Sequence, residues 1–90
     1  MITVNLPYSF TKMTNHQDTI RVQAHTVSEA LRELVSYFPG LKNYIYDTNN
    51  QCNEFLSIYV NGCEKDINNN QNLKVRENDV ISLVTAIAGG

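Results

Sequence analysis

The sequence TVSEALRELVSYF, residues 26–38, carries the pattern of one amphipathic helix. Thr26 and Glu29 have the spacing of a capping box, in which a hydroxyl and a carboxylate satisfy free backbone N–H groups at a helix start. The apolar residues that follow recur at intervals of three and four, and so share one helical face: Val27, Ala30, Leu31, Leu34, Val35 and Phe38. Pro39-Gly40 then predicts the helix end. The segment therefore predicts a helix that covers one apolar surface.

Two strands are predicted before this helix. Residues 2–6 and 18–24 both alternate apolar and polar side chains, the period of a half-buried strand. Residues 9–17 are polar and irregular, and they predict a connection longer than a tight turn. We expect the two strands to pair in antiparallel fashion.

Three further strands are predicted after the helix. A short helical turn over 41–46 and a polar loop over 47–53 lead to a strand over 55–60. Asn61-Gly62 is a strong hairpin signal, because both residues tolerate the positive φ of a type I′ turn. A returning strand is expected over 63–67, followed by a polar loop over 68–72.

The last strand begins at Val80 and is apolar on both faces, which is typical of a strand in the middle of a sheet or under a partner. One helix can cover only one face of a small sheet. The predicted fold class is therefore α+β, with a mixed sheet of four to five strands and one main helix packed across it.

Length and composition limit the function. Ninety residues, 42% of them hydrophobic, predict a single folded domain over residues 1–90. The net charge of −2, without a basic run, argues against a nucleic-acid partner. No apolar run approaches the roughly 18 residues of a membrane span, and a signal-peptide pattern is missing, so we expect a cytoplasmic protein without a membrane partner.

The chain ends in VISLVTAIAGG, residues 80–90, with no charged side chain after Asp79. Gly89 and Gly90 lack Cβ atoms, so this end can lie extended in a slot too narrow for other residues. We expect residues 86–90 to be a flexible tail that brings the Gly90 carboxylate into another protein's active site. The alternative is a frayed end that happens to be glycine.

This order of elements with this terminus resembles the MoaD/ThiS family of ubiquitin-like β-grasp sulfur carriers. The matching residues are the turn after Tyr59-Val60, the Glu77-Asn78-Asp79-Val80 approach and the final Ala86-Ile87-Ala88-Gly89-Gly90. Asn78 stands where the family commonly has glycine, and Asn also accepts the left-handed conformation. The length and the Ala-x-Ala-Gly-Gly end look most like the carriers that serve cysteine biosynthesis.

The resemblance implies a protein substrate rather than an enzyme. An E1-like adenylyltransferase would use ATP and Mg²⁺ to convert the Gly90 carboxylate into an acyl-adenylate, and this chain itself would bind no cofactor. A sulfur donor, either a sulfurtransferase or a sulfide source, would then leave a thiocarboxylate for a sulfur-accepting biosynthetic enzyme. Where a carrier needs trimming, a metalloprotease is a further partner.

The resemblance also places partner-binding residues near the tail, at Tyr59, Val84, Ala86, Ile87 and Ala88. Exposed apolar positions on a strand often mark partner sites, which favours this interpretation for Val84, Ala86 and Ile87. Plain packing is the alternative for Val84 and Ala86.

Three other functions stay open. A ubiquitin-like modifier would be activated in the same way and then joined to lysines through Gly90. The small subunit of molybdopterin synthase would use the same thiocarboxylate together with a stable large subunit. A β-grasp interaction module would have a tail without a covalent role.

The remaining polar residues do not suggest an active site within the chain. Cys52 and Cys63 lack the spacing and the number of ligands of a zinc site, so we expect ordinary thiols and no metal. His16 and His25 are interpreted as incidental polar residues. Glu29 and Glu33 stand one turn apart, opposite the apolar helical face, and are interpreted as part of a solvated surface.

Overall fold

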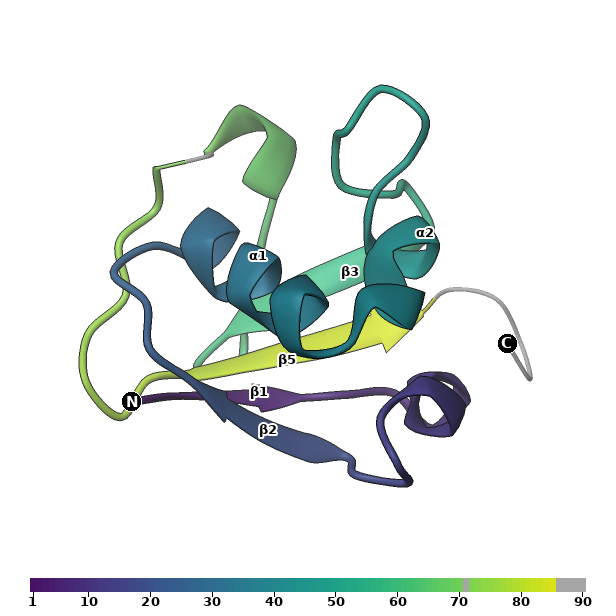
Figure 1. Ribbon diagram of the computed structural model, residues 1–90. Helices are drawn as coiled ribbons and strands as arrows, with labels where there is room; N and C mark the ends of the chain where they lie inside the picture. Colours follow the sequence, from purple (N-terminus) through teal and green to yellow (C-terminus); the bar gives the residue numbers. More distant parts are fainter. Residues whose placement is uncertain (71, 86–90) are drawn as a thin grey trace.

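The computed structural model describes residues 1–70 and 72–85 (Figure 1). The strands are β1 (Ile2–Asn5), β2 (Thr19–Val22), β3 (Leu56–Val60), β4 (Cys63–Lys65) and β5 (Val80–Thr85). The α-helices are α1 (Val27–Tyr37) and α2 (Lys42–Ile45), and short 3₁₀ helices are η1 (Tyr8–Met13), η2 (Pro39–Leu41) and η3 (Ile67–Asn69). The order of the strands and α-helices is the predicted one, whereas η1 and η3 lie in segments that were predicted to be irregular or strand.

The strands form one mixed sheet in the order β2-β1-β5-β3-β4. β1 pairs with β2 in antiparallel fashion, as predicted, whereas β5 runs parallel to β1 and antiparallel to β3. The apolar last strand therefore lies in the centre of the sheet. Figure 1 shows α1 crossing one face of the sheet, and the structure confirms the α+β architecture.

Helix α1 begins at the predicted capping box. Thr26 Oγ1 accepts a hydrogen bond from the Glu29 backbone N–H over 3.1 Å. The Glu29 carboxylate accepts from the backbone N–H of His25 over 2.8 Å, one residue before the position that a capping box uses. The helix buries Val27, Ala30, Leu31 and Leu34 against the sheet, as its periodicity predicts.

The connection between β1 and β2 differs from the predicted irregular loop. It contains η1, and Phe10 within it is only 1% exposed. The Phe10 ring lies 5.6 Å from the ring of Tyr44, centroid to centroid. An aromatic side chain adds a large apolar area to a small core, so this connection packs as part of the core.

Two strand boundaries also differ from the prediction. β3 begins at Leu56, because Phe55 lies in a turn where its N–H donates to Asn53 Oδ1 over 3.0 Å. β4 ends at Lys65, and the buried Ile67 belongs to η3 rather than to the strand. The predicted polar loop over 68–72 begins inside η3, where Asn68 and Asn69 lie.

Candidate functional site

The candidate site surrounds the point where β5 ends. Thr85 is the last residue of β5 and pairs with Leu56, while Val84 pairs with Ser57. The predicted site residues of the tail lie outside the described residues: Ala86, Ile87, Ala88, Gly89 and Gly90. The described part of the site is therefore the surface from which the tail leaves.

Val84 and Tyr59 lie on the sheet face opposite α1. Ile81 and Leu83 alternate with Val84 along β5 and are buried, whereas the Val84 side chain is 46% exposed. Tyr59 pairs with Ser82 on β5 and with Glu64 on β4, and its side chain is partly buried. Their predicted role in partner binding stays a prediction.

Two exposed aromatic residues that no sequence motif marks lie at the same end of the sheet. Phe55 is 50% exposed and directly precedes Leu56, the partner of Thr85. Tyr8 is 88% exposed and starts η1, shortly after Asn5 pairs with Ser82. Figure 1 shows η1 on the same side of the molecule as the end of β5. We call Tyr8, Phe55 and Val84 the exit surface.

Sequence alone gave a weak signal for these two aromatic residues. Phe55 fits the alternation of the following strand, and Tyr8 follows a proline in a segment without regular periodicity. The parallel pairing of β1 and β5 places Tyr8 near the end of β5, and this pairing cannot be deduced from the local sequence.

The start of β5 is fixed by a hydrogen-bond network between two turns. Asn61 Nδ2 donates to Asp79 Oδ1 over 3.0 Å, and the Val80 N–H donates to Asn61 Oδ1 over 2.9 Å. The Arg76 N–H donates to Asp79 Oδ2 over 2.8 Å. The Arg76 backbone and the Asn61 amide both favour the carboxylate and lower the pKa of Asp79 below its usual value of 3.8.

The cysteines and histidines considered for catalysis or metal binding differ in their exposure. Cys63 is exposed, whereas Cys52 is partly buried, and burial together with Asp47 raises the pKa of the Cys52 thiol to about 11. His16 and His25 are exposed. Within residues 1–70 and 72–85, no three His, Cys, Asp or Glu side chains are grouped so that they could hold a metal ion. No helix in these ranges is both long and apolar enough to cross a membrane.

The sequence model of the ThiS family matches residues 8–90, a span that includes the terminal glycines. No significant match is found among curated proteins.

Solved structures with the same fold are more numerous. CysO from Mycobacterium tuberculosis, described as an antigen, has a TM-score of 0.86 at 18% identity, over 97% of this chain and 100% of that chain. The BexX/CysO complex from Amycolatopsis orientalis gives 0.85 at 22% identity, over 100% of both chains. SAMP1 from Haloferax volcanii gives 0.84 at 20% identity, over 99% of this chain and 98% of that chain. These proteins are ubiquitin-like, and the predicted β-grasp fold is confirmed.

Proposed function

We propose that this chain, which belongs to the ThiS family, is a sulfur carrier whose Gly90 carboxylate is adenylated by an E1-like enzyme and then converted into a thiocarboxylate. The observation that carries the proposal is the family match, which spans nearly the whole chain and includes Gly89 and Gly90. The chain is then a substrate of other enzymes rather than an enzyme itself.

The chemistry of the tail supports this role. A carboxylate is a poor electrophile until one of its oxygens becomes part of a leaving group. Transfer of AMP from ATP, with release of pyrophosphate, supplies that leaving group, and ATP and Mg²⁺ bind to the activating enzyme. Hydrosulfide then attacks the acyl carbon, AMP leaves, and the thiocarboxylate remains. Where the donor is a persulfide of a sulfurtransferase, the acyl disulfide that forms is cleaved by a second thiol, which forms a disulfide with the donor sulfur and releases the same thiocarboxylate.

The central position of β5 gives the tail a fixed starting point from which to enter a partner's active site. β5 is hydrogen-bonded to β1 on one side and to β3 on the other, so its end is held by the centre of the sheet. Fully extended, the five residues after Thr85 would span about 17 Å. That reach would suffice for an active site that lies well below the surface of the partner.

We further propose that the acceptor enzyme belongs to a biosynthetic pathway that needs reduced sulfur, with cysteine biosynthesis as the first candidate. The structural likeness to two CysO proteins supports this choice, together with the Ala-x-Ala-Gly-Gly end. A ubiquitin-like modifier is the second candidate, because a similar structure is described as small archaeal modifier protein 1.

Intact mass spectrometry would test the proposal after incubation of the chain with host extract, ATP and a sulfur source. We expect a mass gain that matches the replacement of one oxygen by sulfur, mapped to Gly90 by fragmentation. A variant with one residue appended after Gly90 is the matched control and should not change in mass. Higher-mass conjugates without the sulfur product would favour the modifier. An unchanged mass, in an extract that converts a known carrier, would contradict both candidates.

A further inference from the structure

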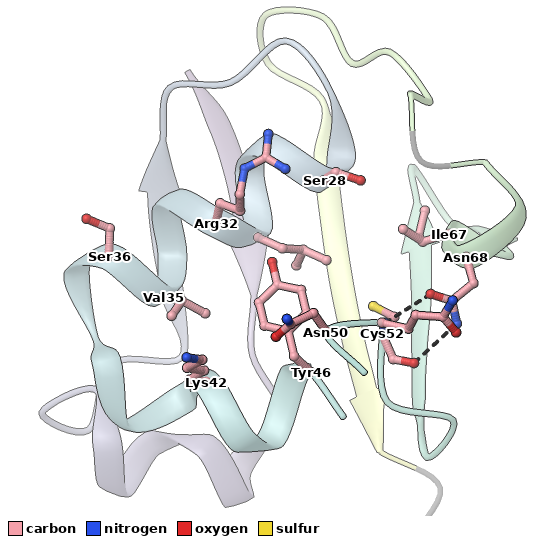
Figure 2. Close-up of a pocket in the computed structure, with 12 residues that line it drawn as sticks. Ser28, Arg32, Val35, Ser36, Lys42, Tyr46, Asn50, Cys52, Ile67 and Asn68 are labelled. Atoms are coloured by element: carbon pink, nitrogen blue, oxygen red, sulfur yellow. Dashed lines mark hydrogen bonds between the residues drawn. The ribbon is translucent and has the colours of Figure 1, made fainter. Parts of the chain in front are cut away.

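A hollow with a volume of about 550 Å³ lies beside α1, and the exit surface contributes no residue to it (Figure 2). Its walls come from α1, from α2, from the loop over residues 46–52 and from η3. The volume lies within the range of about 300–1,000 Å³ that is usual for binding pockets. It is open to solvent along one side.

The floor of the hollow is apolar. Leu31 and Ile67 are buried, and Val35 and Tyr46 are partly buried beside them. The Tyr46 hydroxyl is protonated at neutral pH, since burial raises its pKa further above the usual 10.0, and it can donate a hydrogen bond. The floor therefore offers apolar contact and one polar donor.

The two charged side chains that line the hollow are both cationic, although the net charge of the chain is −2 and the Asp47 carboxylate lies behind the wall at Gln51. Arg32 on α1 and Lys42 at the start of α2 both line it, and both side chains are exposed. The twelve described residues that line the hollow include neither Asp nor Glu. Within the described ranges, neither cation forms a salt bridge with an acidic residue.

The walls of the hollow are fixed by hydrogen bonds. Asp47 Oδ1 accepts from the backbone N–H groups of Asn49 and Gln51 over 2.8 and 3.0 Å. Asn68 accepts from the Cys52 N–H over 2.9 Å and donates to the Cys52 carbonyl over 3.2 Å, and Figure 2 shows both bonds. Walls that are already ordered reduce the entropy that a ligand must lose on binding.

We propose that this hollow binds a segment of a partner protein in which acidic residues stand next to apolar ones. The acidic side chains pair with Arg32 and Lys42, and the apolar side chains contact Leu31, Val35 and Ile67. The two cations are carried by different helices (Figure 2), with the apolar floor between α1 and η3. A peptide that carries acidic side chains beside apolar ones complements both the cations and the apolar floor. This inference is independent of the chemistry at Gly90.

Two-dimensional NMR of the ¹⁵N-labelled full chain would test the proposal. The probe is a pool of acetylated hexapeptides in which Asp or Glu residues stand next to Leu or Ile. The matched pool carries Asn or Gln in place of the acids. We expect the acidic pool to shift the amide resonances of Arg32, Gln51 and Cys52 and to leave that of Tyr59, on the opposite sheet face, in place.

Charge-neutral variants test the two cations. The double variant Arg32→Gln/Lys42→Gln should weaken binding of the acidic pool by about tenfold, because two charge-assisted contacts are lost. The control Lys12→Gln/Arg21→Gln removes the same charge from exposed residues outside the hollow and should leave affinity unchanged.

Four outcomes of these binding measurements would overturn the proposal. These are the absence of binding by the acidic pool, equal binding of both pools, equal weakening by the two double variants, and binding of hexanoate as tightly as the peptides. The last outcome would indicate a site for small organic acids.

The two cysteines give a second readout in the same samples. Cys52 lines the hollow, whereas Cys63 is exposed on β4 and lies outside it. The bound acidic pool should slow alkylation of Cys52 relative to Cys63, as measured by peptide mapping. An unchanged ratio of the two rates at saturating peptide would place the peptide elsewhere and overturn the proposal.

Discussion

Asn61 and Asp79 join two turns that are distant in sequence, through a hydrogen bond of 3.0 Å between Asn61 Nδ2 and Asp79 Oδ1. Asn61 begins the β3–β4 hairpin turn with φ of 50°, and its N–H donates to the Val80 carbonyl over 2.8 Å. The Asp79 carbonyl accepts from the Thr3 N–H over 3.0 Å. The pair therefore ties the hairpin, the start of β5 and β1 together, and fixes the strand from which the tail extends.

The Asn61 side chain should stabilise the fold independently of its backbone conformation. Asn61→Gly keeps the positive φ at no steric cost and keeps the backbone bond to Val80, but it removes the two side-chain bonds to Asp79 and to the Val80 N–H. We therefore expect a loss of about 1–2 kcal/mol in the free energy of unfolding. Asn61→Ala should lose about 1 kcal/mol more, because alanine is strained in this conformation. Urea denaturation measures both.

Asn15→Gly is the matched control for this pair. Asn15 is exposed and has φ of 54°, and its side chain forms no hydrogen bond within the described ranges. Its replacement should change stability by less than about 0.5 kcal/mol. If Asn61→Gly is as stable as the unchanged chain, the pair does not brace the two turns.

Asp79 should make stability depend on pH in the acid range. Its pKa in the folded chain lies below the usual 3.8, since the Arg76 N–H and the Asn61 amide favour the carboxylate. As the pH falls, Asp79 is therefore protonated in the unfolded chain before it is protonated in the folded chain. The stability that the Asp79 carboxylate contributes to the fold is then lost as the pH falls through the folded pKa. The unchanged chain should exceed Asp79→Asn in stability at pH 7, and the difference should shrink below pH 3.8. A difference that stays constant on acidification would contradict this prediction.

The buried face of α1 should dominate the stability of the core. Leu34 is fully buried at 0% exposure, so Leu34→Ala should lower the free energy of unfolding by about 2–5 kcal/mol. Glu33→Ala on the same helix removes a partly exposed side chain and should cost less than about 0.5 kcal/mol. Thermal and urea unfolding of the two variants would give the comparison, and equal losses would mean that the helical face is not the core contact.

The features that could be predicted from sequence are those with a strong local period or a specific turn chemistry. The spacing of apolar residues and the Thr26–Glu29 cap located α1, and Asn61-Gly62 located the hairpin. The apolar character of β5 indicated its central place in the sheet, which the structure confirms between β1 and β3, although Val84 on the face away from α1 is 46% exposed.

The features that were missed depend on contacts between distant segments. Phe10 lies in a polar segment without periodicity, yet it is buried in the folded chain, where its ring lies beside that of Tyr44 on α2. Asn68 belongs to an asparagine-rich stretch that resembles an unstructured loop, yet its amide holds the Cys52 backbone. The exit surface likewise depends on strand pairing that no local pattern encodes.

We predict that the activating enzyme contacts the exit surface, and a substitution at Val84 tests this prediction. Under the proposed function, Val84→Asp places a charge in the desolvated contact, and kcat/KM for ATP-dependent activation by the host's E1-like enzyme should fall about tenfold. Because Val84 is 46% exposed, unfolding stability should fall by no more than about 1 kcal/mol. Gln23→Glu adds the same charge at an exposed position just after β2, at the sheet end where Val22 pairs with Ile2, and should leave kcat/KM unchanged. Pyrophosphate release measures the rate. Equal kcat/KM values for the two variants would show that the enzyme does not dock on the exit surface. That result would not contradict the proposed activation of Gly90.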